Sequence, residues 1–414
     1  MSAARLHCRF CAEPLALVFA DLASSPLSNA YLTADALDRA EPHYPLTVYV
    51  CERCWLCQLP EAARPDEIFS ADYAYFSSYS ASWVEHARRY CEAMIERFGL
   101  GAAEQVVEIA SNDGYLLRHF VARGVPVLGV EPAANVAAAA RAVGVPTEVR
   151  FFGLEAARDL ASRGFAADLL LGNNVLAHVP DLNDFVAGLA HLLKPQGVLT
   201  LEFPHLVRLV AGNQFDTIYH EHYSYFSLAS VERVLAAHRL ELFDVEELAT
   251  HGGSLRLFAQ RLGEGGRPVT DRVEAVRQCE AASGVETRAY YEAFAEQVRE
   301  TKRKLLTFLI AAKRAGKSIA AYGAAAKGNT LLNYCGVRGD FVDYVVDANP
   351  HKQGRFLPGS RLPIHAPERL FATRPDYVLI LPWNLQAEIA EQMHAVREWG
   401  GRFVVAIPET TVLP

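Results

Sequence analysis

Between residues 105 and 204 the sequence alternates short apolar segments with helical ones, and this alternation constrains the chain more than any other feature. Segment 105–110 (QVVEIA) is predicted to be a short buried strand, followed by a glycine turn and an apolar helix. Segments 126–132 (PVLGVEP), 167–179 (ADLLLGNNVLAHV) and 197–204 (GVLTLEFP) are further predicted strands. Strands and helices in this order favour an α/β fold with a doubly wound sheet, in which ligands bind beyond the carboxyl ends of the strands.

Polar residues gather where those strands end. The first turn lacks the G-x-G-x-x-G pattern of a pyrophosphate cradle, so a nicotinamide dinucleotide is disfavoured. S-adenosylmethionine needs no such cradle, and an acidic residue after the second strand can accept hydrogen bonds from its ribose hydroxyls. The order of strand, helix, K-P-x-G and strand also resembles that of class I methyltransferases. We therefore predict an S-adenosylmethionine site formed by Glu108, Asn112, Asp113, Gly114, Glu131, Asn173 and Asn174.

Two C-x-x-C pairs near the start of the sequence predict a structural zinc site. Cys8 and Cys11 form the first pair and Cys51 and Cys54 the second, about 40 residues later. Four thiolates give a closed tetrahedral site that holds a fold and leaves no position for chemistry. Scattered buried cysteines and a redox pair are the alternatives. Cys57 is interpreted as a non-ligand and has no assigned role.

Segment 215–227 (FDTIYHEHYSYFS) is the candidate catalytic segment, because it concentrates titratable and aromatic groups. Histidine changes charge near neutral pH and suits proton abstraction, and a tyrosine hydroxyl can donate to a developing oxyanion. We choose His222 as the base, with Glu221 and Tyr219 in support. In an extended strand Glu221 would face away from His222, so they act together only if the chain turns there. An aromatic core strand, a metal site through His220 and His222, and a substrate lid remain alternatives.

Other candidate substrate contacts are spread along the chain. The aromatic stretch before the predicted sheet alternates with serines and favours a loop that closes over a ligand, although plain packing explains it equally well. The remaining candidates lie in the second predicted pair of strands, in the catalytic segment and in the T-H-G-G-S stretch. The predicted contacts are Tyr73, Tyr75, Tyr79, His178, Tyr225 and His251.

The last part of the sequence predicts a second α/β unit. A long charged helix over 285–316 connects to a strand at 317–323, and later apolar segments complete a small parallel sheet. Gly323, Lys327 and Asn329 lie at the strand-to-helix turn, where amide groups and the helix dipole favour an anion. This unit is predicted to hold a nucleotide diphosphate. A purely structural or dimerisation domain is the alternative.

Composition excludes some partners. The chain has 414 residues and a net charge of −8, whereas nucleic-acid-binding proteins usually carry a basic excess. The first residues lack the pattern of a signal peptide, and no run of about 18 apolar residues suggests a membrane span. We expect a cytoplasmic protein with reduced thiols, either a monomer or a small homo-oligomer.

Together these motifs resemble the nucleotide-sugar C-methyltransferase family of deoxysugar biosynthesis. The matching pieces run in order along nearly the whole chain: the paired C-x-x-C, VVEIASNDGYLL, NNVLAHVPDL, YHEHYSYFS, HGGSLR and YGAAAKGNTLLNYCG. The resemblance implies a zinc-binding domain (1–72), a class I S-adenosylmethionine-binding domain with a Rossmann-like fold (73–260) and a second Rossmann-like domain for the nucleotide sugar (261–414).

The resemblance also implies the reaction and a histidine base, which falls on His222 with Glu221 and Tyr219 beside it. The expected substrate is a thymidine-diphosphate (TDP) 4-keto-6-deoxysugar, methylated at a carbon next to the ketone, with C-3 favoured. Methylation at C-5, methylation of an oxygen, and a nucleotide-binding protein without catalysis are the alternatives.

Overall fold

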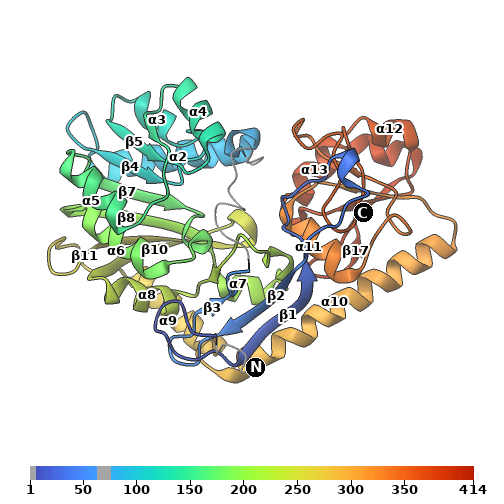
Figure 1. The fold of residues 1–414 in the computed structure, drawn as a ribbon, viewed down its shortest axis with the longest axis horizontal. Coiled ribbons are helices and arrows are strands. Elements are labelled where there is room, and N and C mark those ends of the chain that lie inside the picture. Colours follow the sequence, from blue (N-terminus) through green and yellow to red (C-terminus); the bar gives the residue numbers. More distant parts are fainter. Residues whose placement is uncertain (1–5, 63–75) are drawn as a thin grey trace.

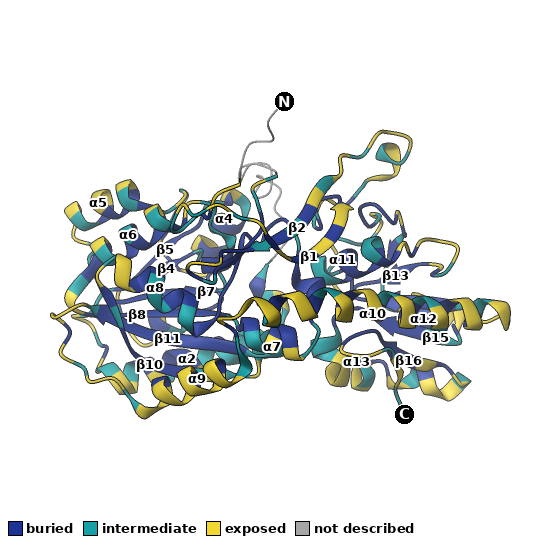
Figure 2. Ribbon diagram, turned by 90° about the horizontal axis from the view of Figure 1, so that it is seen from below, coloured by how far each residue is buried: buried dark blue, intermediate teal, exposed yellow. Residues whose placement is uncertain are grey.

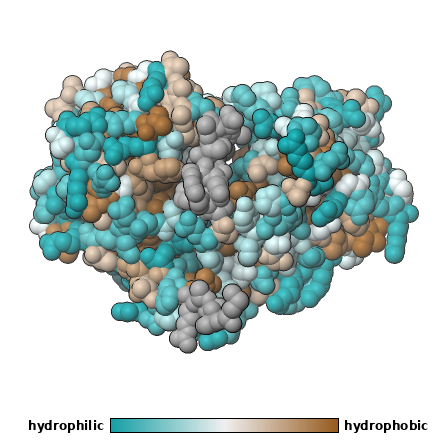
Figure 3. Space-filling model, in the orientation of Figure 1, coloured by the Kyte–Doolittle hydropathy of each residue, from teal (hydrophilic) through white to brown (hydrophobic). Residues whose placement is uncertain are grey.

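The chain forms two lobes joined by a long helix and a small antiparallel sheet (Figure 1). This computed structural model describes residues 6–62 and 76–414. One lobe contains the middle of the sequence and the other contains its carboxyl-terminal third. The outline of the molecule dips between the lobes in the space-filling view (Figure 3).

The amino-terminal sheet includes a strand from the middle of the sequence. Its order is β1-β2-β3-β9, with every neighbouring pair antiparallel. The short helix η1 (Ala34–Ala36) lies in the loop between the first two strands. The strands are β1 (Leu17–Ser25), β2 (Tyr44–Val50), β3 (Cys57–Gln58) and β9 (Ser224–Tyr225). Because β9 belongs to the candidate catalytic segment, this sheet fixes that segment to the zinc-binding part of the chain.

The central sheet has seven strands in the order β10-β11-β8-β7-β4-β5-β6. Its strands from β6 to β8 are parallel, and β11 runs antiparallel to both of its neighbours. The strands are β4 (Val106–Ile109), β5 (Val127–Val130), β6 (Thr147–Glu148), β7 (Ala167–Asn173), β8 (Leu193–Pro204), β10 (Leu240–Leu248) and β11 (Ser254–Arg261). The predicted doubly wound sheet is confirmed.

Helices cover both faces of the central sheet, and each face has its own apolar core. One face is covered by α2 (Ala81–Phe98), α3 (Leu117–Val121) and α4 (Ala134–Ala142). The other is covered by α5 (Leu154–Ser162), α6 (Leu182–Leu192), α8 (Leu228–Ala237) and α9 (Asp271–Ser283). The connecting short helices are η2 (Ser77–Tyr79), η3 (Leu176–His178), α7 (Leu206–Ala211), η4 (Phe215–Thr217) and η5 (Thr250–Gly252).

The carboxyl-terminal lobe is a second α/β unit, with a sheet in the order β14-β13-β12-β15-β16-β17. Only β17 is antiparallel to its neighbour. Its strands are β12 (Ile319–Tyr322), β13 (Val345–Val346), β14 (Ile364–His365), β15 (Tyr377–Ile380), β16 (Arg402–Val405) and β17 (Thr411–Val412). Its helices are α11 (Ala326–Cys335), α12 (Arg369–Thr373), η6 (Trp383–Leu385), α13 (Gln386–Gln392) and η7 (His394–Trp399).

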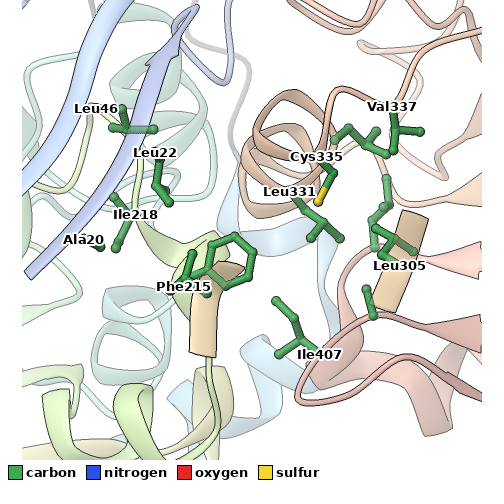
Figure 4. Close-up of a cluster of buried hydrophobic side chains, with 14 of the residues drawn as sticks. Ala20, Leu22, Leu46, Phe215, Ile218, Leu305, Leu331, Cys335, Val337 and Ile407 are labelled. Atoms are coloured by element: carbon green, nitrogen blue, oxygen red, sulfur yellow. The ribbon is translucent and has the colours of Figure 1, made fainter. Parts of the chain in front are cut away.

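Helix α10 (Arg288–Arg314) runs along the molecule from the amino-terminal sheet to the second lobe (Figure 1). Its buried face alternates with a strongly exposed one (Figure 2). Phe294 on that buried face stacks on Phe19 of β1, with the ring centroids 4.5 Å apart. Residues from β1, α10, the catalytic segment and the carboxyl-terminal sheet share one apolar core, part of which is drawn in Figure 4. The amino-terminal sheet and the second lobe are therefore packed as one body.

The expected boundary at residue 260 falls at the end of β11, and the next helix, α9, still packs against β10 of the central sheet. The expected boundary at residue 72 lies outside the described residues. In the parts of the chain that the structure describes, no helix combines the length and apolarity needed to cross a bilayer.

Candidate active site and metal centre

The four predicted zinc ligands meet at one point. The Cys8 and Cys54 sulfurs are 3.6 Å apart, and Cys11 lies 3.5 Å from Cys51 and 3.7 Å from Cys54. All four sulfurs lie within 4.8 Å of one another. A tetrahedral zinc with bonds of about 2.3 Å requires sulfur–sulfur separations of about 3.8 Å. The spacing therefore fits a four-thiolate zinc site, with no open position.

A short chain of contacts connects the metal site to the catalytic segment. Gln58 of β3 donates from Nε2 to the Cys8 sulfur at 3.2 Å, and its own Oε1 accepts the Arg9 amide at 2.8 Å. Gln58 also pairs with Ser224 of β9. The neighbouring Cys57 is fully buried in the core and pairs with Tyr225, and burial raises the pKa of its thiol. The extra cysteine is thus a core residue that packs outside the metal site.

The predicted cofactor residues lie together at the carboxyl edge of the central sheet. Glu108 is the last residue but one of β4, Glu131 follows β5, and Asn173 ends β7. The amides of Asn112 and Ala133 donate to the two oxygens of the Glu131 carboxylate, at 3.0 and 2.9 Å. These two bonds fix the turn after β4 against the end of β5.

The turn after β4 depends on backbone conformations that are rare outside glycine. Asn112 has φ of 49° and Gly114 has φ of 75°. A Cβ on Gly114 would come within 3.0 Å of the Val145 side chain and 3.3 Å of Ala140. Asn174, after β7, also has a positive φ, of 53°. The two turns thus place their polar side chains on the same edge of the sheet.

Several buried polar atoms at this edge have no partner among the described residues. Both oxygens of Glu108 and both amide atoms of Asn173 are in this state. Burial, reinforced by the charges of Glu131 and Asp113, raises the pKa of Glu108 well above its usual value. Burial also raises the pKa of Glu131 to about 7. Because S-adenosylmethionine carries a positive charge and several hydrogen-bonding groups, it suits an edge of unsatisfied acceptors and donors.

The segment just before α2 lies across this edge. The Ser77 amide donates to Asn112 Oδ1 at 2.8 Å, and the Ser78 amide donates to Asp113 Oδ2 at 3.1 Å. The Tyr79 hydroxyl lies 3.0 Å from Nε2 of His351 in the other lobe. The segment thus contacts both the cofactor turn and the second lobe. The predicted contacts Tyr73 and Tyr75 lie outside the described residues.

The H-E-H segment turns, as a joint role for its residues requires. The His222 amide donates to the Tyr219 carbonyl at 2.9 Å, closing a tight turn over His220 and Glu221. The Glu221 carboxylate accepts from Nδ2 of Asn29 at 2.5 Å. His220 Nε2 lies 3.2 Å from the Pro45 carbonyl, which ties this ring to the amino-terminal sheet.

His222 has one nitrogen fixed by the main chain. Its Nδ1 lies 2.7 Å from the Thr217 carbonyl, which can only accept, so Nδ1 carries the proton and Nε2 has the lone pair. The Tyr219 ring lies 4.0 Å from the His222 ring and the His178 ring 4.7 Å from it. Burial, then the charge of His178 and more weakly that of Lys327, lowers the pKa of His222 well below its usual value. The ring is therefore neutral at pH 7.

Two further predicted histidines lie in the same region. Burial lowers the pKa of His178 to about 4, and burial together with the charge of Lys327 lowers that of His251 to about 4. His251 Nε2 lies 3.2 Å from Nδ2 of Asn174, which connects it to the cofactor edge. Tyr225 stands edge-on to His222, with the centroids 6.2 Å apart. The site thus contains neutral imidazoles that can accept or relay a proton.

Lys327 reaches this site from the second lobe. Its ammonium lies 2.8 Å from Asn384 Oδ1 and 4.8 Å from the centre of the Trp383 ring. The Trp383 indole donates to Asp216 Oδ2 at 2.9 Å. Sequence reasoning missed Asp216, Trp383 and the orienting carbonyl of Thr217. Asp216 lies inside the candidate catalytic segment but received no role there, and nothing in the local pattern marked Trp383, because their contact spans 167 residues.

A buried ion network also escaped prediction. Glu202 of β8 is fully buried and contacts His86 Nε2 and Arg256 Nη2, each at 3.0 Å. Trp83 stacks on His86 and also contacts His251, with centroids 4.8 and 5.0 Å apart. The network thus reaches His251 through the Trp83 ring. The only sign of this network in the sequence was the charged Glu202 inside the apolar segment GVLTLEFP.

The predicted anion turn of the second lobe is built mostly from internal contacts. Gly323 has φ of 92°, and a Cβ there would come within 2.4 Å of Pro382. The Ala324 amide donates to Asp347 Oδ2 at 2.8 Å. Asn329 is fully buried, and both of its amide atoms lack a partner in the part of the chain that is described. Asn329 thus has hydrogen-bonding capacity that the described residues leave unused.

The fold and the site define a class of enzyme. A parallel sheet with one antiparallel strand between β8 and β10, carrying acidic and amide groups at its carboxyl edge, is the arrangement of a class I S-adenosylmethionine-dependent methyltransferase. Known families and relatives agree. Residues 249–408 match the model of a C-methyltransferase C-terminal domain, residues 83–244 a methyltransferase domain, and residues 8–69 a zinc binding domain.

The chain is 38% identical to C-methyltransferase NovU of Streptomyces niveus, over 98% of this chain and 96% of that protein. It belongs to this C-methyltransferase family, and it is an S-adenosylmethionine-dependent C-methyltransferase with a zinc-binding amino-terminal domain.

Solved structures with a similar fold include other methyltransferases. Magnesium protoporphyrin IX methyltransferase from Synechocystis PCC 6803, with bound S-adenosylmethionine, has a TM-score of 0.36 at 15% identity, covering 49% of this chain and 100% of that one. The 1,6-didemethyltoxoflavin-N1-methyltransferase of Burkholderia thailandensis has a TM-score of 0.36 at 18% identity, covering 52% and 95%.

Proposed function

We propose that this enzyme methylates a carbon next to the ketone of a nucleotide-linked 4-keto-6-deoxysugar, with a TDP sugar and C-3 favoured, as a step of deoxysugar biosynthesis. The observation that carries the proposal is His222, a neutral imidazole whose Nδ1 is fixed by Thr217. It lies beside His178, which follows the strand carrying the cofactor residue Asn173, and its pKa responds to Lys327 of the second lobe.

The ketone makes the hydrogen on its neighbouring carbon acidic. Nε2 of His222 takes that proton, and the electron pair of the C–H bond moves toward the carbonyl oxygen to give an enolate. Tyr219, whose ring packs on His222, supplies a hydroxyl donor for the enolate oxygen. S-adenosylmethionine supplies an electrophilic methyl group. The enolate carbon attacks that methyl in line.

The residues contribute mostly by positioning. Holding an enolate carbon and a methyl donor in register lowers the activation barrier by about 7–11 kcal/mol. One oxyanion donor supplies about 3–4 kcal/mol more. Substitution of the base alone is expected to reduce turnover about 10²–10⁴-fold.

The nucleotide part of the substrate is assigned to the second lobe. Asn329 offers a buried amide without a partner among the described residues, close to the amino end of α11. Tyr79 bridges to His351 of that lobe, so the segment before α2 can close over a sugar held between the lobes. Thymidine diphosphate is therefore expected to bind without S-adenosylmethionine.

A pair of histidine variants tests the assignment. His222→Asn should lose about 10²–10⁴-fold in turnover of a TDP-4-keto-6-deoxysugar, with affinity for S-adenosylhomocysteine within about threefold of the wild type. His220→Asn is the matched control, because that ring contacts Pro45 and Tyr44 of the amino-terminal sheet. Its turnover should stay within about tenfold of the wild type. Near-normal turnover by His222→Asn would overturn the assignment.

A further inference from the structure

Lys327 occupies an unusual electrostatic position. It is the second residue of α11, and its ammonium is held by Asn384 and by the face of the Trp383 ring. None of the ion pairs found among the described residues includes it. The carboxylate whose charge it feels is that of Asp216. Lys327 is therefore a half-buried cation whose charge is only partly compensated, and desolvation lowers its pKa.

Asp216 compensates Lys327 weakly for a physical reason. Burial raises the pKa of Asp216 to about 7, even though the charge of Lys327 acts to lower it. One of its oxygens accepts from the Trp383 indole, and the other has no partner in the described parts of the chain. Asn384 and the Trp383 ring thus hold the lysine in place, while Asp216 compensates its charge only in part.

That charge acts on the two candidate histidines, and Asp216 directly precedes Thr217, whose carbonyl holds the His222 ring. The charge of Lys327 contributes to the lowered pKa of both His222 and His251. A base with a depressed pKa can remove a carbon-bound proton only if the resulting anion is strongly stabilised. A tyrosine hydroxyl offers one neutral hydrogen bond, whereas an ammonium offers a charge-assisted one of roughly twice the strength.

We propose that Lys327 is a further catalytic residue, whose ammonium binds the ketone oxygen of the substrate and neutralises the enolate. Asp216, Trp383 and Asn384 are its positioning residues. The inference rests on the proposed function, and it moves Lys327 from the diphosphate, its expected ligand, to the reacting carbonyl.

The step balances within the site. As His222 takes the proton, the C–H electron pair forms a carbon–carbon double bond and the carbonyl π pair moves onto oxygen, where Lys327 donates a hydrogen bond. When the carbon attacks the methyl group, the carbonyl re-forms and the carbon–sulfur electrons stay on sulfur. The proton on His222 then returns to solvent, and Lys327 keeps its own throughout.

The test measures enolisation apart from methyl transfer. Zinc-loaded enzyme with S-adenosylhomocysteine and a saturating TDP-4-keto-6-deoxysugar is placed in deuterium oxide, and loss of the proton next to the ketone is followed by NMR. Lys327→Met should slow this exchange about 10²–10³-fold. Affinity for thymidine diphosphate should stay within about threefold of the wild type. Lys304→Met, an exposed lysine paired with Glu409, is the control and should exchange normally.

Each remaining outcome decides the question. Normal exchange by Lys327→Met at saturating substrate overturns the inference. This holds even if the variant binds thymidine diphosphate more than tenfold more weakly than the wild type. If Lys327→Met also loses S-adenosylhomocysteine binding, Trp383→Phe replaces it, since this change removes the indole donor to Asp216 and keeps an aromatic ring beside Lys327. Trp383→Phe should slow exchange with nucleotide affinity unchanged, and a wild-type rate contradicts the inference. No exchange by the wild-type enzyme overturns the proposed function as well.

Discussion

At the scale of single residues, the site combines neutral imidazoles with acidic groups that are costly to ionise. His178, His222 and His251 have pKa values lowered chiefly by burial, whereas Glu108 and Glu131 have pKa values raised by it. A free enzyme that keeps such groups desolvated sacrifices stability for binding. We expect that cost to be relieved when a cationic cofactor arrives.

Glu108→Gln tests this cost. A carboxyl whose pKa is higher in the folded chain than in the unfolded chain makes folding less favourable as pH rises above about 4.5. Glu108 is such a group, because it is fully buried without a partner among the described residues. The cofactor-free variant should therefore gain about 1–3 kcal/mol of stability over the wild type at pH 8 and much less at pH 5.

Denaturant unfolding at the two pH values measures this difference, and calorimetry measures the cofactor. The same variant should bind S-adenosylmethionine about tenfold more weakly, because an amide, unlike the carboxyl group, cannot ionise when the cationic end arrives. If the free energy of unfolding changed equally with pH in the variant and in the wild type, Glu108 would not carry this cost of burial.

Much of the site at this scale could be predicted from the sequence, and part could not. Cys8, Cys11, Cys51 and Cys54 stand at a recognisable spacing and do meet in space. The polar residues after each strand were found because carboxyl ends of parallel strands share one edge. Thr217 orients His222 through a backbone carbonyl, which no residue type reveals.

At the scale of elements, β9 matters most, because it joins the catalytic segment to the zinc-bearing sheet. It has only two residues, and its partner β3 lies more than 160 residues earlier in the chain. Long, periodic segments such as 285–316 and 167–204 were predictable as helix and strands, because local patterns determine them. A two-residue strand is determined by its distant partner, so the sequence left a core strand in segment 215–227 as one alternative and could not place it beside β3.

Loss of the metal should therefore affect catalysis before cofactor binding. Cys51→Ala removes one zinc ligand and loosens β3, and hence His222, whereas the cofactor edge belongs to another sheet. In Cys51→Ala, turnover should fall at least about tenfold. The affinity for S-adenosylhomocysteine should fall by a smaller factor than turnover does. Cys57→Ala is the control and should retain one zinc per chain, at a stability cost of about 1–2 kcal/mol. Metal analysis and kinetics on both variants give the result, and unchanged turnover in zinc-free Cys51→Ala would refute this link.

At the scale of the whole molecule, the amino-terminal sheet, α10 and the second lobe share one apolar core (Figure 4). The sequence predicted three domains in order. It could not predict that the first and third pack as one body around α10, because the periodicity of a helix shows that one face is buried and does not identify its partner. The proposed base, His222, follows η4 of this core and lies beside His178, which follows β7 of the central sheet.

Phe294→Ala tests the shared core. Phe294 is fully buried and stacks on Phe19, so its truncation should cost about 3–5 kcal/mol. Hydrogen exchange should rise together in β1 and in β15, although the two strands belong to different sheets. Arg299→Ala, on the exposed face of α10, is the control and should change neither. Faster exchange in β1 alone would show that the two parts unfold independently.

The central claim is that a carbon next to a ketone receives the methyl group after His222 removes its proton. S-adenosylmethionine labelled with ¹³C in its methyl group, incubated with the enzyme and a TDP-4-keto-6-deoxysugar, tests it most directly through the NMR spectrum of the product. We predict a ¹³C methyl bonded to the carbon beside the ketone, formed by the wild type and lost in His222→Asn. A labelled methyl on oxygen, or equal product from the variant, would contradict the claim.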